Sequence, residues 1–562
     1  MRYLFLLMAG SLVGSGFAFL RADADSSVAT ADFTNAVILG LDPTGQADGT
    51  PRLQAALDAG KTRIFFPEGT YLLGTVNVPG KARLVFGDDT AVSINPALIQ
   101  DKVLFRVAGN NVAIQNLKLV FPKVGDHEMG PAELDALIKG DNITNLTVDG
   151  LKALRTQGNY QQLCGIVLGG CSDISVTRCE ISNLYGLVMT FYTQRVAVRN
   201  NKATHCDHIT LFRDGSEWLT HEGNWSSQVG HQCEWWGGDA DTQKPSLSMS
   251  TVDVMNRGTS PQTPGFVPNT PGAYDIQVLG NYAEYGVTLA WGSKGRDILI
   301  SNNVARYMGD MCYDAEGCEN VVISNNVAID ARFFGIGCYF WGNSVLIANN
   351  LIVVNSEGDP TYQGDFIRLQ SPANPAFGSG KVLITGNLCI GKKDRIRLVN
   401  LERSRDVTIS GNKFMNGRIN VTSEAQDVSI LNNEITEDLP GNYSAITGAS
   451  GNSLYIRNNI IRRKENEQAP VVGAAAAISN FVTAGGKRAV EGNLIDGWKF
   501  SAWSGTVSST GIPGIFRNNT ISGELLEDKD GRLFDQGNIL LSNPTLVTFR
   551  VASAAEAATP KP

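Results

Sequence analysis

Apolar and polar residues follow a short pattern that recurs along most of the chain. An apolar-x-apolar run leads into a pair of turn residues, and the second of the pair is Asn. The clear copies are VAVRNN, ILISNN, VVISNN and VLIANN, which end at Asn201, Asn303, Asn326 and Asn350; weaker copies end at Asn387, Asn412, Asn433, Asn459 and Asn519. From Asn281 to Asn350 the copies are 22, 23 and 24 residues apart. A period of roughly 20 to 50 residues indicates a solenoid.

The local period within each repeat indicates which kind of solenoid to expect. Runs of about four to six residues alternate apolar and polar positions, are rich in Val, Ile and Leu, and are separated by Gly and Asn, which predicts β-strands. No repeat contains an amphipathic stretch long enough for a helix. Three short strands and three turns fit one period, so each repeat predicts one coil of a parallel β-helix. The recurring Asn suits a left-handed turn position, and its amide can hydrogen-bond to the Asn one coil away.

The N-terminal part of the chain carries motifs of its own. They are LDPTGQADGT at 41–50, LQAAL at 53–57 and IFFPEGTY at 64–71. This run resembles the N-terminal cap of the pectate-lyase-like superfamily, and the resemblance extends over roughly 36–540. It implies an all-β fold, a right-handed parallel β-helix with a capping helix at 53–58. The superfamily includes glycoside hydrolases, polysaccharide lyases, epimerases, esterases, tailspikes and adhesins, so the resemblance implies the fold rather than one reaction.

The chain divides into four expected parts. Residues 1–24 read as a signal peptide, with a basic start, an apolar stretch and an Ala-x-Ala site, although an uncleaved anchor remains the alternative. The protein is therefore expected to be secreted, and no later apolar run is long enough to span a membrane. One β-helix domain occupies 36–540. It is interrupted at 237–272 by a Ser-, Thr-, Pro- and Gly-rich loop, which is either a lid over the site or a disordered insertion. Residues 541–562 are expected to be a C-terminal tail that is disordered at its Ala- and Pro-rich end, 552–562.

Composition and charge exclude several classes of function. Only 18% of the 562 residues are charged, and the net charge of −8 argues against nucleic-acid binding. The nine Cys form no CxxC and are expected to be small buried core residues rather than a disulfide framework. His205, Cys206 and His208 do not share one face, so neither a metal nor another cofactor is expected. Oligomeric state stays open.

Candidate chemistry comes from the strand that precedes each Asn-bearing strand. Six coils align on Gly186, His208, Gly230, Gly286, Asp310 and Gly335, and the fourth and sixth places after these residues are expected to face outward. The fourth places are Thr190, Phe212, Glu234, Ala290, Asp314 and Tyr339, and the sixth are Tyr192, Asp214, Trp236, Gly292, Glu316 and Trp341. This alignment predicts a notch with small residues at its base, between acidic and aromatic walls. Such a notch suits a sugar ring.

The carboxylates of this face are the expected catalytic groups. Glu234 and Asp314 lie two coils apart, which predicts a separation of roughly 9–10 Å at a strand spacing of about 4.8 Å. Inverting glycosidases need about 6.5–9.5 Å between their two carboxyl groups. Asp314 and Glu316, two residues apart, would lie nearer about 6.6 Å, so the stereochemical outcome stays open.

The leading expectation is a secreted glycoside hydrolase that acts on a polysaccharide or oligosaccharide. Asp314 would work with Glu316 or Glu234 as acid and base, while Trp236, Tyr339 and Trp341 stack on sugars and Asp214 contributes to binding. Arg368 and Arg397 could bind an anionic substituent, or equally form ion pairs with Glu402 and Asp365. Two alternatives remain: a polysaccharide lyase or epimerase acting on uronic acids, and a non-catalytic glycan-binding or adhesive β-helix.

Overall fold

Most of the chain between the two termini is described by the structure. The computed structural model describes residues 32–546 except for 131, 157–162, 236–271, 340–341, 371–379, 393–395, 423, 439–443, 449–452, 464–475, 480–486, 499, 504–513, 523, 528–532 and 541–542. The expected signal peptide at 1–24 and nearly all of the expected loop at 237–272 lie outside the described residues. Of the expected tail at 541–562, only residues 543–546 are described, as the short strand β58 (Asn543–Leu546).

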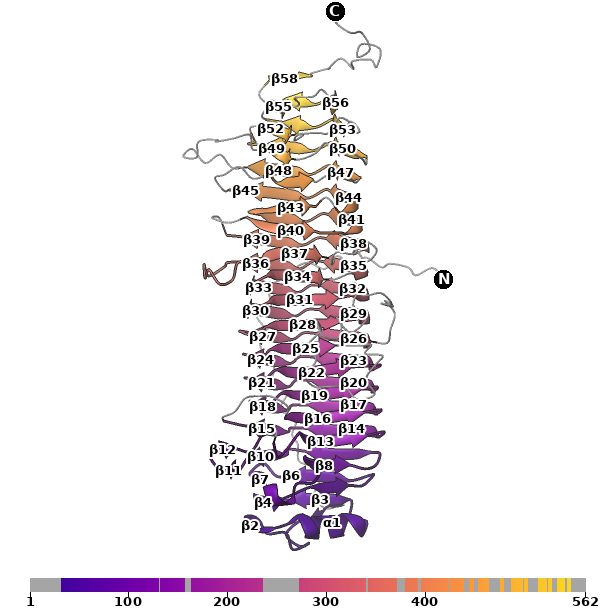
Figure 1. Ribbon diagram of the computed structural model, residues 1–562, viewed down its shortest axis with the longest axis vertical. Coiled ribbons are helices and arrows are strands. Elements are labelled where there is room, and N and C mark those ends of the chain that lie inside the picture. The colour runs from indigo at the N-terminus through magenta and orange to yellow at the C-terminus, as the bar shows by residue number, and fades with distance from the viewer. Residues whose placement is uncertain are drawn as a thin grey trace, which may run out of the picture.

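Each coil contributes one strand to each of three parallel sheets, which run along the whole solenoid (Figure 1). In its middle part, sheet C contains β13 (Ala136–Asp141), β16 (Cys164–Gly169), β19 (Gly186–Phe191), β22 (His208–Arg213), β25 (His231–Trp235), β28 (Thr288–Ser293), β31 (Met311–Glu316), β34 (Phe334–Tyr339), β37 (Asp365–Gln370), β40 (Arg397–Leu401) and β43 (Gly417–Val421). Sheet A contains β14 (Thr144–Asp149), β17 (Ser172–Thr177), β20 (Gln194–Arg199), β23 (Glu217–Glu222), β26 (Tyr274–Leu279), β29 (Arg296–Ser301), β32 (Cys318–Ser324), β35 (Gly342–Ala348) and β38 (Gly380–Thr385). Sheet B contains β15 (Lys152–Leu154), β18 (Glu180–Ser182), β21 (Lys202–Thr204), β24 (Trp225–Ser227), β27 (Tyr282–Glu284), β30 (Val304–Met308), β33 (Val327–Ala331), β36 (Leu351–Val354) and β39 (Leu388–Gly391). The chain passes from sheet C to A to B and back to C, which confirms the expected right-handed parallel β-helix.

The core consists of rows of identical or similar side chains, one member from each coil. In sheet A, Ile276 pairs with Ile298, Ile298 with Val321, and Val321 with Val345, and each is at most 2% exposed. Burying such a side chain stabilises the fold by roughly 1.5–3 kcal/mol. Because strand side chains alternate, the residues between these positions face solvent. The outward positions of the sheets are therefore available for function.

The repeat assigned two roles to one Asn: left-handed backbone and a hydrogen bond to the next coil. At the turn from sheet A to sheet B, these roles belong to two adjacent residues. The first residue of the pair adopts left-handed backbone, as at Asn302 (φ 60°) and Asn325 (φ 57°). The second is buried, and the side-chain amide of Asn303 donates to Oδ1 of Asn326 at 3.0 Å. The same contact links Asn201, Asn224, Asn281, Asn303, Asn326, Asn350, Asn387, Asn412, Asn433, Asn459, Asn493, Asn519 and Asn538, a row called here the asparagine ladder.

One helix closes the N-terminal end of the solenoid, as the cap motifs predict. This helix, α1 (Thr50–Asp58), begins three residues before the expected segment and places Leu53 and Leu57 in the core. Its Gln54 exchanges two hydrogen bonds with the backbone of Asn77, at 3.2 and 2.9 Å. The cap therefore shields the apolar end of the first coils from water.

All nine Cys are buried and free of disulfides, which confirms their expected place in the core. Burial raises the pKa of several of these thiols, for example to about 12 at Cys164 and Cys233. Within the described residues, no helix is both long and apolar enough to cross a membrane.

Candidate functional site

An outward column on sheet C brings together two acidic residues and a tryptophan from three successive coils. In register, Glu234 of β25 pairs with Trp291 of β28, and Trp291 pairs with Asp314 of β31. Two residues further along the same face, Ser293 pairs with Glu316. Three carboxyl groups thus surround the outward side of Trp291. The structure confirms that Glu234 and Asp314 share a column, two strands apart.

The residues expected between these acids differ from those observed. Ala290 and Gly292 were expected to face outward, but Ala290 is fully buried and the outward position belongs to Trp291. The expectation fails because the corner before each strand varies in length: Glu234 follows Gly230 by four residues, whereas Trp291 follows Gly286 by five. A shift of one residue turns every side chain of a strand to the opposite face. The notch with a base of small residues is therefore wrong.

The same shift affects other aligned coils. Thr190 and Phe212, expected outward, are fully buried, and Met189 and Leu211 occupy the column instead. After Asp314 the column continues with Gly337, so Tyr339 lies two residues beyond the position that the alignment gave it.

Glu234 is buried in contact with a histidine. Its side chain is only about 3% exposed, and its Oε2 forms a short hydrogen bond with Nε2 of His208 on the preceding coil. Burial by itself would raise the pKa of Glu234, but the charge and the hydrogen bond of His208 lower it below its usual value. Conversely, burial opposes a charged His208, yet Glu234 raises its pKa above the usual value. The pair therefore favours an ionised carboxylate at Glu234.

Further rings and charges hold His208 in place. Its Nδ1 lies 3.5 Å from a carboxylate oxygen of Asp207, and the ring of Tyr185 lies 5.0 Å away, between ring centres. His231 stacks on Trp291 at 4.6 Å, and burial lowers its pKa. The neutral His231 thus fills the space between the His208–Glu234 pair and the indole.

Asp314 and Glu316 differ from Glu234, because their pKa values are raised rather than lowered. Burial is the main cause that raises the pKa of Asp314 well above its usual value, and the charges of Glu316 and Asp310 add to it. Burial likewise raises the pKa of Glu316 to about 8, although hydrogen bonds with Trp291 and Asp314 oppose the change. Asp314 Oδ1 also accepts a hydrogen bond from the Tyr339 backbone N–H at 3.3 Å. The raised pKa values therefore favour the protonated forms of both carboxyl groups.

Raised carboxyl pKa values make stability depend on pH in a defined direction. Because Glu316 binds its proton more tightly in the folded state, its contribution to stability is complete below about pH 4.5 and is lost as the pH rises towards about 8. We expect the unfolding midpoint to fall between pH 6 and pH 9, and Glu316→Gln to reduce that fall, as measured by circular dichroism. Glu319→Gln, on sheet A of the same coil, is the control. An equal fall in the wild type and Glu316→Gln would contradict the prediction.

The other expected binding residues are only partly brought together. Tyr339 is half-buried beside Asp314, and Arg368 lies in the same column as Asp314, with Gly337 between them. Asp214 lies at the corner after β22, with Oδ2 3.8 Å from Nε of Arg213. Trp236 and Trp341 lie outside the described residues.

The two arginines do not lie opposite each other, whereas the alternative ion pair between Arg368 and Glu402 is confirmed. Arg368 is opposite Asn400 in register, not Arg397, and one of its terminal nitrogens lies 3.4 Å from Glu402. Arg397 is only 6% exposed, so its side chain is not available beside Arg368 for an anionic substituent. It lies at the start of β40. Burial raises the pKa of Asp365, and the charges of Arg368 and Arg397 partly oppose this rise.

Sequence reasoning missed the two groups that organise the site, His208 and Trp291. His208 had been used to align coils and had been rejected as a metal ligand, although its place at the start of the strand before Glu234 was a signal that the two could meet. Trp291 is one residue from an expected outward position, so the misplaced register concealed it. Among the described residues, no group of three or more His, Cys, Asp or Glu is arranged to hold a metal ion.

Comparisons with known proteins give distant structural similarities only. No family model matches the chain, and no curated protein matches it. Similar solved structures include pre-mature bacteriophage phi29 gene product 12, at 12% identity over 87% of this chain and 68% of that chain, with a TM-score of 0.49. A family 28 exopolygalacturonase of Yersinia enterocolitica is 11% identical over 75% and 78%, with a TM-score of 0.41. PfbA, a surface adhesin of Streptococcus pneumoniae, is 13% identical over 75% and 92%, with a TM-score of 0.33. At these values the three proteins say nothing about the activity of this chain.

Proposed function

We propose that the protein is a glycoside hydrolase that cleaves a polysaccharide or its oligosaccharides on sheet C. One observation carries the proposal: carboxyl groups on either side of Trp291 have pKa values shifted in opposite directions. His208 lowers the pKa of Glu234 and favours its ionised form, whereas burial raises the pKa values of Asp314 and Glu316 and favours their protonated forms. Hydrolysis of a glycosidic bond needs one carboxylate and one carboxylic acid, and environments that separate two pKa values mark such pairs.

The proposed reaction assigns each proton. Glu234 takes a proton from a water molecule as the water oxygen attacks the anomeric carbon. The Asp314–Glu316 pair gives a proton to the glycosidic oxygen as its bond to that carbon breaks. Glu234 and Asp314 lie two strands apart, about 9–10 Å between backbones, which supports an inverting reaction with the water between acid and base. Trp291 would line the sugar ring between them.

Burial of the acid sets a condition on this mechanism. Asp314 has no exposed surface, while Glu316 is 6% exposed. The ring of Phe334 and Oδ1 of Asp314 both lie over Gly337, where an added Cβ would meet them at 2.1 and 2.9 Å. A sugar therefore reaches Asp314 only when neighbouring side chains move, and Glu316 is the more accessible of the two proton donors.

A screen of polysaccharides tests the proposal. Purified protein is incubated with neutral, uronic-acid and sulfated polysaccharides, and reducing ends are measured together with the ultraviolet absorbance of unsaturated products. New reducing ends without this absorbance support hydrolysis. Reducing ends with the absorbance would overturn it in favour of a lyase. Binding without any product would support the non-catalytic alternative.

A lyase or epimerase acting on uronic acids is the second candidate. The observation in its favour is Arg368, which shares the column of Asp314 and could neutralise a uronate carboxylate, as such reactions require. His231, whose pKa is lowered, is a neutral base on the same face. Arg368→Gln would then abolish activity, whereas a hydrolase of neutral sugars would retain it.

His208 is proposed as a positioning residue that sets the charge of Glu234. In His208→Asn, burial is no longer offset by an imidazolium, so the pKa of Glu234 should rise. We expect the acid limb of the kcat/KM profile to move to higher pH by about one unit or more, with a smaller change at the optimum. The control is His205→Asn, an exposed turn histidine three residues earlier. An unmoved acid limb would remove His208 from this role.

A further inference from the structure

The corner between sheets B and C carries one left-handed residue in each of several consecutive coils. These residues are Asn183, His205, Gln228, Tyr285, Tyr307 and Asp330, with φ between 53° and 56°. Left-handed backbone costs a residue with a Cβ roughly 1–2 kcal/mol, and short polar residues such as Asn and Asp tolerate it best. Two successive tyrosines are therefore an unfavourable choice for this corner. Strain of this kind is concentrated at functional sites.

The two tyrosines form an exposed aromatic stack. The rings of Tyr285 and Tyr307 lie 5.0 Å apart between centres, with planes 13° apart. Tyr362, from the loop between β36 and β37, packs on Tyr307 at 5.6 Å. Tyr285 is 54% exposed, so its ring contributes little to the core. The Tyr362 ring is tilted by 58° to that of Tyr307, so the exposed aromatic face at this edge of the solenoid is mainly that of Tyr285.

Polar groups border this surface. The hydroxyl of Tyr307 donates to Oε1 of Glu357 at 2.7 Å, and the guanidinium of Arg306 lies 5.2 Å from the same ring. Gln228 is exposed and occupies the equivalent corner position one coil before Tyr285. An aromatic face combined with an amide and a carboxylate matches a pyranose ring, which presents C–H groups on its faces and hydroxyls around its edge.

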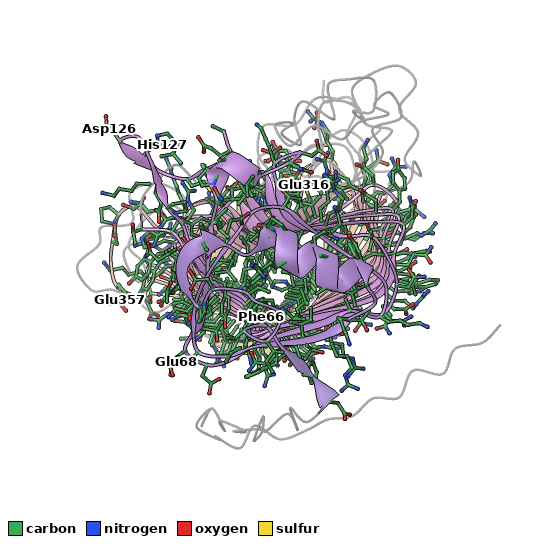
Figure 2. All side chains as sticks on the ribbon, turned by 90° about the horizontal axis from the view of Figure 1, so that it is seen from below. Phe66, Glu68, Asp126, His127, Glu316 and Glu357 are labelled. Atoms are coloured by element: carbon green, nitrogen blue, oxygen red, sulfur yellow. The ribbon has the colours of Figure 1, made fainter. Side chains whose placement is uncertain are left out.

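The stack lies apart from the carboxylates on sheet C. Viewed along the solenoid, Glu357 lies at the outer edge, on a different side of the cross-section from Glu316 (Figure 2). Trp291 follows Tyr285 by six residues in the chain, which is at most about 20 Å of extended strand. A polysaccharide of several units could therefore contact both places, whereas a very short oligosaccharide could not.

We propose that Tyr285, Tyr307 and Tyr362 form a second polysaccharide-binding surface, which stacks on pyranose rings of a chain whose other units reach the carboxylates. The identification of the ligand as a polysaccharide rests on the proposed function. A purely structural role would be to anchor the loop that carries Glu357 and Tyr362. That role requires Tyr307 but not Tyr285, which lies on the side of the stack away from the loop.

Tyr285→Asn separates binding from folding. Asn suits the left-handed position better than Tyr, so the thermal midpoint should stay the same or rise. Affinity electrophoresis is run in gels containing polygalacturonate, a neutral β-glucan or a sulfated galactan. We expect at least one polymer to retard the wild type. The dissociation constant of Tyr285→Asn for that polymer should be roughly tenfold higher, which corresponds to about 1.4 kcal/mol. The matched control is Tyr192→Asn, since Tyr192 is also left-handed and 63% exposed but lies at another corner.

The outcomes distinguish this proposal from the proposed function. Equal retardation of the wild type and Tyr285→Asn would overturn the binding surface, even if the polymer is hydrolysed. Absence of wild-type retardation in all three gels would also overturn it. Loss of retardation in Tyr285→Asn but not in Tyr192→Asn supports the surface, even if the polysaccharide screen detects no hydrolysis. In that last case the proposed function fails and the binding surface stands.

Discussion

Glu234→Gln is expected to lower kcat on the polysaccharide found by the screen by about a hundredfold to ten-thousandfold, because an amide cannot accept the proton of the attacking water. Asp314→Asn should cause a loss of similar size if Asp314 gives up the proton, since an amide is not an acid at neutral pH. Both substitutions keep the size of the side chain, and the folded state can be checked by circular dichroism. Initial rates of reducing-end release measure the effect.

A matched substitution controls for the loss of a charge as such. Glu222→Gln removes a carboxylate from sheet A, where Glu222 pairs with Arg199 at 2.8 Å, and should leave kcat unchanged. If Glu234→Gln retained more than about a tenth of the wild-type kcat, Glu234 would not be the base. Full activity in Asp314→Asn with loss in Glu316→Gln would assign the proton donor to Glu316 alone.

Asn326→Leu is expected to be among the most destabilising single substitutions in the protein. The Asn326 side chain donates to the carbonyl of Ile300 at 2.9 Å, and its Oδ1 accepts from the backbone and side chain of Asn303. Leucine leaves these three buried groups without this partner, at about 1–3 kcal/mol each, so the total loss should be at least about 3 kcal/mol. Guanidinium unfolding followed by circular dichroism measures it.

The neighbouring residue provides the control for the asparagine ladder. Asn325 is left-handed with φ 57°, and Gly occupies the equivalent position at Gly280 and Gly386. Asn325→Gly should therefore change stability by less than about 1 kcal/mol. Equal effects of the two substitutions would mean that the turn, rather than the hydrogen-bonded row, stabilises the coils.

The fold was predictable because its signal is repeated many times. Each coil repeats the same alternation of apolar residues, so a strand that is unclear in one copy can be recognised from the other copies. The buried cysteines follow from the same strand patterns, whereas the short helix at the N-terminus was implied by the resemblance of the cap motifs. Even here, the sequence assigned to one Asn the two roles that the structure gives to Asn302 and Asn303, because adjacent turn residues look alike in a motif.

The candidate site was predictable only in part, because it depends on the register between coils. Glu234 and Asp314 were placed in one column from the sequence, and the structure agrees. Trp291 between them was missed, because a single extra residue in the corner before β28 reverses which side chains face outward. The sequence does not show directly how many residues each corner between strands contains.

The period of the repeat and the alternation within each strand are enough to predict a parallel β-helix with acidic residues on an outward face. The chemistry open to those acids depends on contacts that form only in the folded chain. Ionisation depends on burial and on neighbouring charges, and the neighbours of Glu234 and Asp314 come from other coils. The contact between His208 and Glu234 joins residues 26 positions apart, and the shared burial of Asp314 and Glu316 arises only when the coils stack.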